Sequence, residues 1–230
     1  MSNLGCRTRT QNHRTETVSE RIKTIYSGVH NCTLCHGNPN GTIKSDSKKI
    51  PRKFFSRIVD SRLFMVVQSL AETQVRVSGV PFHDIHGNIS NGGRFLEKSL
   101  NVVGYIISPD KLEFSLIYST DIVQCYPGKN LVGTGDNLPL SSEIELCRPW
   151  LDQALSLLEP QVILLFGSPA NKTFFKHYLH QEFTKLSDYY LRSSCYKDIR
   201  VFSLPHPTSM VRDKTAIYQE TFELIQSAMQ

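Results

Sequence analysis

Residues 160–170 read PQVILLFGSPA, an unbroken apolar run that ends in a Gly-Ser-Pro turn. A short run in which every residue is apolar is typical of a strand buried on both faces of a parallel sheet. A glycine directly after it suits a tight turn into a helix. Three other stretches also place an apolar run before a polar loop: LFMVV at 63–67, SLIYSTDIV at 115–123 and DIRVFSLPHPTS at 198–209.

Segments with helical spacing of apolar residues separate these four predicted strands, at 17–30, 92–105, 141–159 and from 213 onward. Alternating strands and helices predict an α/β fold, a three-layer α/β/α arrangement with a central, mostly parallel four-stranded sheet. In such a sheet the functional residues lie just after the C-terminal ends of the strands. Ser168, directly after the third strand, is therefore a candidate contact for a phosphate backbone, although a plain strand–helix turn explains it equally well.

The chain has 230 residues, 40% of them hydrophobic, which is enough for one substantial core. We expect one domain over residues 17–230 after a polar, disordered tail over residues 1–16, and we expect a monomer. The sequence contains neither an apolar run of membrane-spanning length nor the apolar segment of a secretory signal, so we expect a cytoplasmic protein. A net charge of +5 is compatible with a nucleic-acid partner but does not require one.

Four of the six cysteines form two pairs. Cys32 and Cys35 make a C-x-x-C turn, Cys125 directly follows the second predicted strand, and Cys147 lies in the helix after it. A reducing compartment disfavours disulfides, so metal binding is the first hypothesis to test. Four thiolates suit either tetrahedral zinc or a [4Fe–4S] cluster, and the spacing leaves that choice open. The alternative is that Cys125 and Cys147 are ordinary buried cysteines.

Two loops add more specific motifs, VVQSLAETQVRVSGVPF at 66–82 and LPHPTSMVR at 204–212. With CYPGKN beginning at Cys125 and EIELCRPWL around Cys147, they make the chain resemble the iron–sulfur class of uracil-DNA glycosylases over roughly residues 20–215. The resemblance implies an enzyme that binds DNA and cuts a base from it. It also implies that the two cysteine pairs hold a structural [4Fe–4S] cluster, with Cys6 and Cys195 incidental.

The resemblance assigns roles to residues in both loops. Phe82 falls where the family stacks the extruded base, and an aromatic face offsets the cost of unstacking. His206 is expected to donate to O2 of the base and to stabilise the anionic leaving group. In the same loop Ser209 is expected on a phosphate, Met210 as the wedge that fills the vacated stack, and Arg212 at the motif's arginine.

The first loop departs from the family. Gln68-Ser69 stands where the family has Gly-Glu, and Ala71-Glu72 where it has Pro-Gly. Gln68 and Ser69 are still expected at the base pocket, but the carboxylate that positions water is missing from its usual place. Glu72 and Asp84 are the candidates to replace it. The insert HDIHGNISNGGR after the aromatic position predicts a roomier pocket.

Asp121 is the most informative departure, because the family reads uracil there with an asparagine. An ionised carboxylate only accepts hydrogen bonds and would meet uracil O4 as a second acceptor. Cytosine presents an N4 amino donor at that edge, which Asp accepts readily. The substitution thus favours a cytosine-type base. The alternatives are that Asp121 is protonated, or that it activates water while uracil remains the substrate.

Removal of plain cytosine would destroy the host genome, so the preferred hypothesis is a base modified at C5, with phage DNA as its source and defence as the role. No lysine is evidently placed for a lyase step, which predicts a monofunctional glycosylase that leaves an abasic site. Two alternatives stay open. One is ordinary uracil excision in DNA repair, and the other is a DNA-lesion binding protein without catalytic activity.

Overall fold

The computed structural model describes residues 17–32, 34, 62–69, 71, 82, 88–102, 107–108, 113–114, 117–128 and 136–229. The central strands are β1 (Leu63–Ser69), β4 (Ile117–Val123), β5 (Val162–Phe166), β6 (Ser193–Tyr196) and β7 (Ile199–Leu204). They form a five-stranded sheet in the order β4-β1-β5-β7-β6. The first four strands are parallel, and β6 pairs antiparallel with β7 at one edge.

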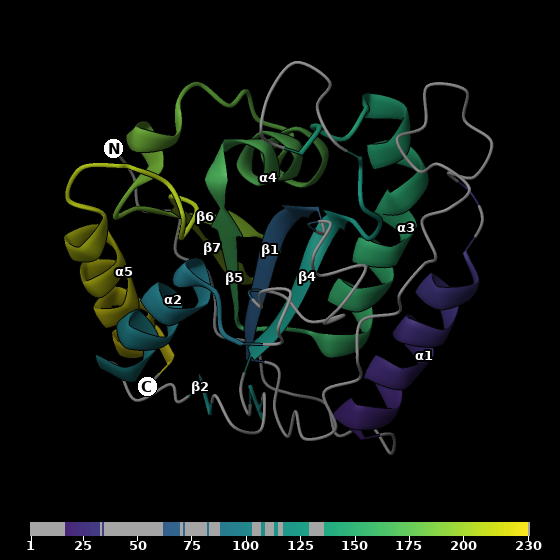
Figure 1. Cartoon of the computed structure of the whole chain (residues 1–230), viewed down its shortest axis with the longest axis horizontal. Coiled ribbons are helices and arrows are strands. Elements are labelled where there is room, and N and C mark those ends of the chain that lie inside the picture. The colour runs from purple at the N-terminus through teal and green to yellow at the C-terminus, as the bar shows by residue number, and fades with distance from the viewer. Residues whose placement is uncertain are drawn as a thin grey trace.

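Helices lie on both sides of this sheet (Figure 1), and their bounds are α1 (Val18–Asn31), α2 (Asn91–Val102), α3 (Ser141–Leu158), α4 (Gly167–Phe174) and α5 (Lys214–Met229). Figure 1 shows α3 with α1 outside it on one side, and α2 with α5 on the other. A π-helical turn (Phe175–Leu179) extends α4, and a 3-10 turn (Leu186–Tyr189) precedes β6. The predicted α/β/α class and the predicted helices are confirmed.

The sheet differs from the prediction by one strand. The four predicted parallel strands are present, and β6 adds a fifth. Its sequence, SSCY, contains no apolar run, because an edge strand packs only partly against the core and three of its four residues are half-buried. A separate two-stranded ribbon, β2 (Ile107–Ser108) with β3 (Glu113–Phe114), was also not predicted. The predicted tail over residues 1–16 lies outside the described residues.

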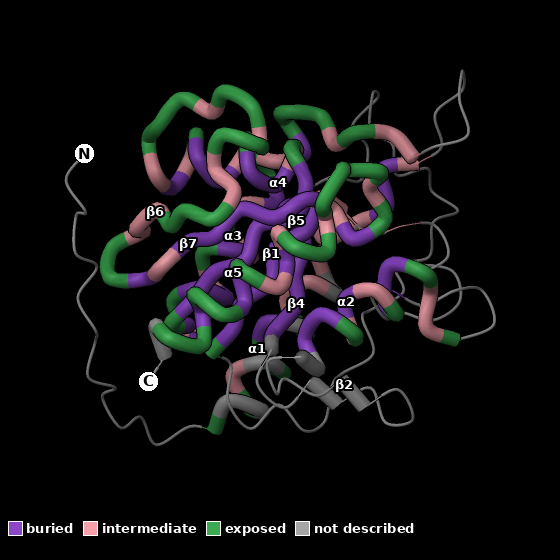
Figure 2. The backbone as a smooth tube through the Cα atoms, turned by 90° about the vertical axis from the view of Figure 1, so that its left-hand side faces the viewer, coloured by how far each residue is buried: buried purple, intermediate pink, exposed green. Residues whose placement is uncertain are grey.

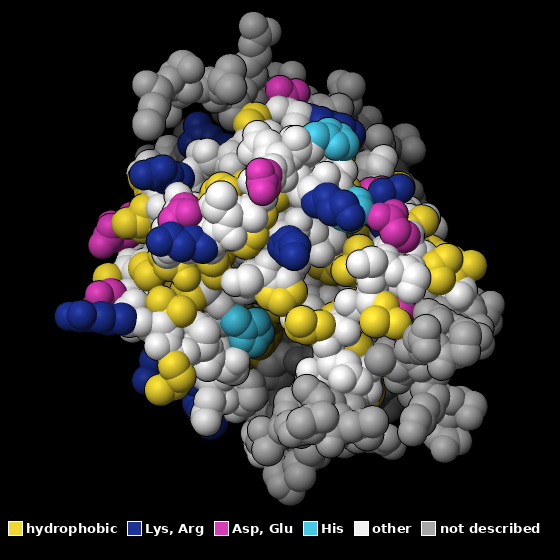
Figure 3. Space-filling model, turned by 90° about the horizontal axis from the view of Figure 1, so that it is seen from above, with side chains coloured by type: hydrophobic (Ala, Val, Ile, Leu, Met, Phe, Trp, Pro, Cys, Tyr) yellow, Lys and Arg dark blue, Asp and Glu magenta, His cyan; other side chains and the backbone are white. Residues whose placement is uncertain are grey.

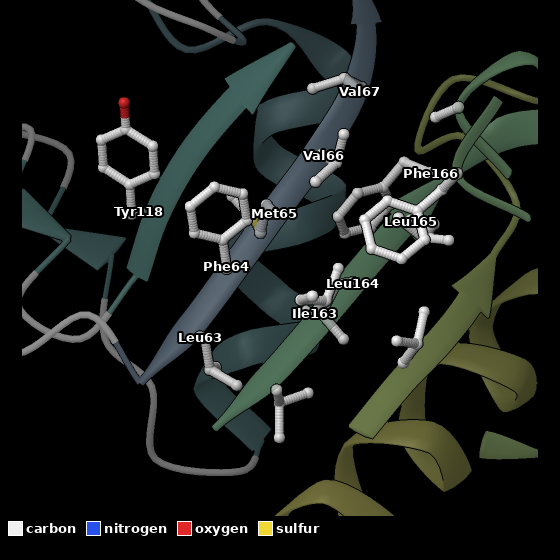
Figure 4. Close-up of a cluster of buried hydrophobic side chains, with 14 of the residues drawn as sticks. Leu63, Phe64, Met65, Val66, Val67, Tyr118, Ile163, Leu164, Leu165 and Phe166 are labelled. Atoms are coloured by element: carbon white, nitrogen blue, oxygen red, sulfur yellow. The ribbon is translucent and has the colours of Figure 1, made fainter. Parts of the chain in front are cut away.

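The core is centred on β1 and β5, where Leu63–Val67 and Val162–Phe166 are all buried (Figure 2). Side chains project from both faces of these neighbouring strands (Figure 4), and the Phe64 and Tyr118 rings lie 5.1 Å apart. Each buried aliphatic side chain of this kind contributes about 1.5–3 kcal/mol. Continuous apolar strands are therefore the consequence of helices covering both faces of the sheet. Among the described helices, none is long and apolar enough to cross a membrane.

Candidate active site at the carboxyl ends of the parallel strands

The register of the sheet places the predicted site residues along one edge. Val67 of β1 aligns with Asp121 of β4, and Phe166 of β5 aligns with Leu204 of β7. Since the four strands are parallel, their carboxyl ends open on the same side, and His206 lies two residues beyond the end of β7. Three inter-strand spacings of about 4.8 Å separate β4 from β7, so the backbones of these two strands lie about 14 Å apart, with β1 and β5 between them.

His206 is held by its own turn. Its Nδ1 accepts from the Thr208 backbone amide at 3.3 Å and lies 2.8 Å from the Thr208 hydroxyl. The Ser209 amide and hydroxyl both donate to the His206 carbonyl, at 2.9 and 2.7 Å. Because a backbone N–H can only donate, Nδ1 must carry the lone pair. The proton of the neutral imidazole then sits on Nε2, which leaves Nε2–H as the outward donor.

Electrostatics keep this imidazole neutral. Burial lowers the pKa of His206, and the positive charge of Lys214 lowers it further. Protonation of Nδ1 would also set two donors face to face, at Thr208. The turn is also held by α5, where the buried Tyr218 hydroxyl donates to Pro205 O at 2.6 Å. The arrangement presents a fixed, neutral donor at the sheet edge.

Phe82 meets this turn across the start of α2. Its side chain is buried, its backbone lies in the left-handed region at φ 62°, and its carbonyl accepts from the Ser90 amide at 2.7 Å. A Cβ on Gly92 would lie 2.8 Å from the Thr208 methyl and 3.9 Å from the Phe82 ring. A Cβ on Gly93 would lie 2.7 Å from the Phe82 carbonyl. The two glycines thus let α2 fit between the aromatic residue and the histidine turn.

Asp121 is 2% exposed near the end of β4. Beyond it, the Gln124 amide folds back and donates to the Thr120 hydroxyl and to the Asp121 carbonyl, each at 2.6 Å. These contacts close the end of the strand and fix the backbone from which Asp121 projects. Gln68 and Ser69, at the neighbouring end of β1, are half-buried.

The predicted DNA contacts lie on the outer surface of this edge. Met210 is fully exposed, and Arg212 is exposed beside Asp213 at 3.7 Å. Ser168 is exposed in the first turn of α4, directly after Gly167, which has φ 80°. The face where β5 passes into α4 (Figure 3) carries Lys and Arg side chains spread among acidic and uncharged ones. The Ser209 hydroxyl proton, by contrast, is used inside the turn on the His206 carbonyl.

Three of the four predicted cluster ligands are described: Cys32 directly after α1, Cys125 after β4 and Cys147 within α3. α1 and α3 are antiparallel, because Arg21 donates to Leu157 O at 2.7 Å and Gly28 lies directly against the Trp150 ring. Cys32 lies about one turn beyond Gly28, and Cys147 about one turn before Trp150, so both lie toward the same end.

Cys125 directly follows Gln124 in the sequence, and the backbone amide of Gln124 contacts Cys147. This backbone amide donates to Cys147 Sγ at 3.1 Å. Amide-to-sulfur contacts of this kind tune metal-bound thiolates. Within the described ranges, however, no three His, Cys, Asp or Glu side chains form a metal-binding group. The remaining predicted ligand, Cys35, lies outside those ranges. Cys195, on β6, lies at the opposite edge of the sheet from β4.

Sequence reasoning missed several residues that shape the site, and it placed two others where nothing is described. Glu72 and Asp84, the candidate water-positioning carboxylates, lie outside the described residues. Thr208, Gln124 and Lys214 were missed because they act through backbone contacts that no residue pattern reveals. The adjacent glycines in the first turn of α2 were a usable signal, since paired glycines at a helix start often mark a close approach.

The comparisons with known proteins agree with this architecture. The family model described as the uracil DNA glycosylase superfamily matches residues 55–230, which include the whole central sheet and the histidine loop. A search of curated proteins found no match. The length of the family match establishes that the chain belongs to the uracil DNA glycosylase superfamily.

Proposed function

We propose that the protein is a monofunctional DNA glycosylase that flips a cytosine-type base out of DNA and cleaves its N-glycosidic bond, leaving an abasic site. Membership of a superfamily of DNA glycosylases supports the reaction class and DNA as the partner. Family membership does not determine which base is excised. The observation that carries the choice of base is Asp121, buried in β4 on the far side of the sheet edge from His206.

The hydrogen-bonding groups of Asp121 and His206 are complementary to those of cytosine. A buried carboxylate accepts from the N4 amino group, where an amide in the same place would also offer a donor to O4 of uracil. The His206 Nε2–H donates to O2 and stabilises the negative charge that develops on the departing base. A buried polar edge left unmatched costs about 1–3 kcal/mol per contact, which is the basis of discrimination between the two bases.

Other residues complete the proposed site. Phe82 stacks on the extruded base, with Gln68 and Ser69 alongside. Glu72 and Asp84 are the proposed water-positioning carboxylates. Ser168, Ser209 and Arg212 are proposed to contact the DNA backbone, and the fully exposed Met210 to enter the vacated stack. These assignments rest on sequence motifs and on the placement of the described members around one sheet edge.

We further propose that Cys32, Cys35, Cys125 and Cys147 hold a [4Fe–4S] cluster. The all-thiolate donor set suits it, and two contacts support the proposal: Gly28, four residues before Cys32, packs on Trp150 of α3, and the backbone amide of Gln124, next to Cys125, donates to Cys147 Sγ. The cluster would have a structural role, tying the segment around Cys32 to the loop that follows β4.

The proposal that the base carries a group at C5 follows from biology rather than from geometry. An enzyme that removed unmodified cytosine would damage its host, so the substrate is proposed to carry a group at C5. Phage DNA is the proposed source of that base, and defence the proposed role.

The decisive variant is Asp121→Asn. Wild type and variant are incubated with duplexes containing uracil, cytosine or 5-modified cytosine, and abasic sites are revealed by alkaline cleavage. We expect Asp121→Asn to slow excision of the cytosine-type base and to gain activity on uracil. Asp188→Asn, on the exposed turn before β6, is the matched control and should behave as wild type. Efficient uracil excision by wild type that Asp121→Asn leaves unchanged or abolishes would reject the cytosine hypothesis and favour uracil repair with Asp121 activating water.

A further inference from the structure

Lys214 begins α5 and reaches back to the histidine turn. Its Nζ donates to Pro207 O at 2.6 Å and to Ser209 O at 2.8 Å. It also lies 4.4 Å from the centroid of the Phe95 ring of α2. An ammonium group has three N–H donors and no acceptor. Two carbonyls and one aromatic face therefore account for all three N–H donors. This half-buried ammonium group is directed toward the protein rather than toward solvent.

These contacts complete a set that fixes the backbone on both sides of His206. The Tyr218 hydroxyl holds the carbonyl of Pro205, and the Ser209 amide and hydroxyl hold that of His206. The Lys214 ammonium group holds the carbonyls of Pro207 and Ser209. Tyr218 is fully buried in α5, so the turn is tied to a rigid helix through both residues. The Nε2–H direction depends on this backbone, because Thr208 of the same turn fixes Nδ1.

We propose that Lys214 is a positioning residue for base excision, which holds the turn between Pro205 and Ser209 so that Nε2–H of His206 points at the base. The proposal rests on the proposed function and names a residue that the sequence motifs do not include. Lys214 touches neither the base nor the reacting atoms, and it acts through the carbonyls. A misplacement of a catalytic group by about 1 Å can cost about a hundredfold in rate.

The charge of Lys214 gives the proposal a signature that packing alone would not produce. Around the turn, α5 presents Lys214 and Tyr218, α2 presents the exposed Arg94, and the first turn of α4 carries no charged side chain. Of the charged groups in the described part of the chain, Lys214 is the one that lowers the pKa of His206, in addition to the larger effect of burial. Removal of the charge should raise the pKa of the imidazole, whereas a guanidinium in its place should keep it low.

The test compares Lys214→Met and Lys214→Arg, with Lys185→Met, an exposed lysine before the 3-10 turn, as control. Single-turnover excision of the best substrate is measured across pH, and the His206 ring is titrated by NMR without DNA. We expect Lys214→Met to slow excision about tenfold to a hundredfold and to move the acid limb and the His206 titration to higher pH. Lys214→Arg should keep the wild-type titration and most of the rate, and Lys185→Met should match wild type.

Two results would overturn the proposal. One is a wild-type excision rate in Lys214→Met. The other is a slower rate together with an unmoved His206 titration and a lower melting temperature, which is the pattern of a purely structural lysine. If wild type excises no base at all, the proposed function fails, and the NMR titration still decides between an active role for Lys214 at His206 and none.

Discussion

The His206 imidazole owes its orientation to a backbone amide, that of Thr208, and its outward donor to the tautomer this contact selects. His206→Ala removes the donor to O2 but none of the hydrogen bonds made by its backbone carbonyl. We expect the single-turnover rate to fall by about a hundredfold to a thousandfold, the size of effect seen when one oxyanion donor is lost, with DNA affinity nearly unchanged. Fluorescence anisotropy beside the excision assay separates the two. A loss confined to DNA affinity would make His206 a structural loop residue.

The pKa of the His206 imidazole predicts how the excision rate depends on pH. Burial, then the Lys214 charge, lowers the pKa of His206 below the usual value of about 6.5. In the proposed mechanism the neutral ring is the active form, so excision should stay on its plateau as pH falls through about 6.5 and drop only nearer the lowered pKa.

Stability follows by linkage. Below about pH 6.5 the unfolded chain takes up a proton at this histidine while the folded chain does not, so the contribution to stability is present above that pH and is lost as pH falls toward the folded pKa. Thermal melts of wild type and His206→Gln across this range measure it. Identical pH dependence of the two melting temperatures would contradict a lowered pKa.

The start of α2 sets the distance between Phe82 and the histidine turn. A methyl group added at Gly92 would lie 2.8 Å from the Thr208 methyl, while the next atoms lie at 3.6 and 3.9 Å. Gly92→Ala should therefore cost about 1–3 kcal/mol by overpacking and slow excision, because it displaces the turn.

A second substitution should reverse that effect. Thr208→Ser removes the methyl in question but keeps the hydroxyl that contacts His206 Nδ1 at 2.8 Å. The double variant Gly92→Ala/Thr208→Ser should recover most of the melting temperature and the excision rate, with Thr208→Ser alone as the control. If the double variant is no better than Gly92→Ala, this contact is not what sets the packing.

The elements differ in how far the sequence predicts them. The four parallel strands can be predicted from the sequence because burial on both faces makes them continuously apolar, as in Val162–Phe166. β6 is not, because an edge strand needs no such run. At the start of α3 both Glu143 and Glu145 could accept a backbone amide, and the Glu143 carboxylate accepts that of Leu140 at 2.8 Å. Local propensity cannot choose between acidic residues two positions apart when the chain direction into the helix is set by packing.

The site divides in the same way. His206, Phe82 and Asp121 were found because they lie in loops or at strand ends with motif-like surroundings. Lys214 and Gln124 donate to backbone carbonyls of other residues. Every residue has a backbone carbonyl, so the sequence does not indicate which ones a side chain will contact. Contacts between side chain and backbone are therefore the part of a site that residue patterns predict least well.

For the molecule as a whole, the proposed cluster ties α1 to the sheet through α3. Protein purified without oxygen should be brown, with broad visible absorption that dithionite bleaches, and iron analysis should give about four atoms per chain. Cys147→Ser should lose the colour and lower the melting temperature, since α1 would be held to α3 only by side-chain packing and by the hydrogen bond from Arg21 to the Leu157 carbonyl. Cys195→Ser, at the opposite edge of the sheet, should keep the colour. A colourless wild type that contains one zinc would exclude the iron–sulfur cluster.

The measurement that bears most directly on the function is abasic-site formation by the wild-type protein on matched duplexes that differ at a single base. Family membership, the fixed donor at His206 and the buried Asp121 together predict alkali-labile sites at 5-modified cytosine and almost none at uracil. Rapid cleavage at uracil with none at any cytosine would contradict the proposed role of Asp121, and binding without cleavage of any duplex would contradict catalysis itself.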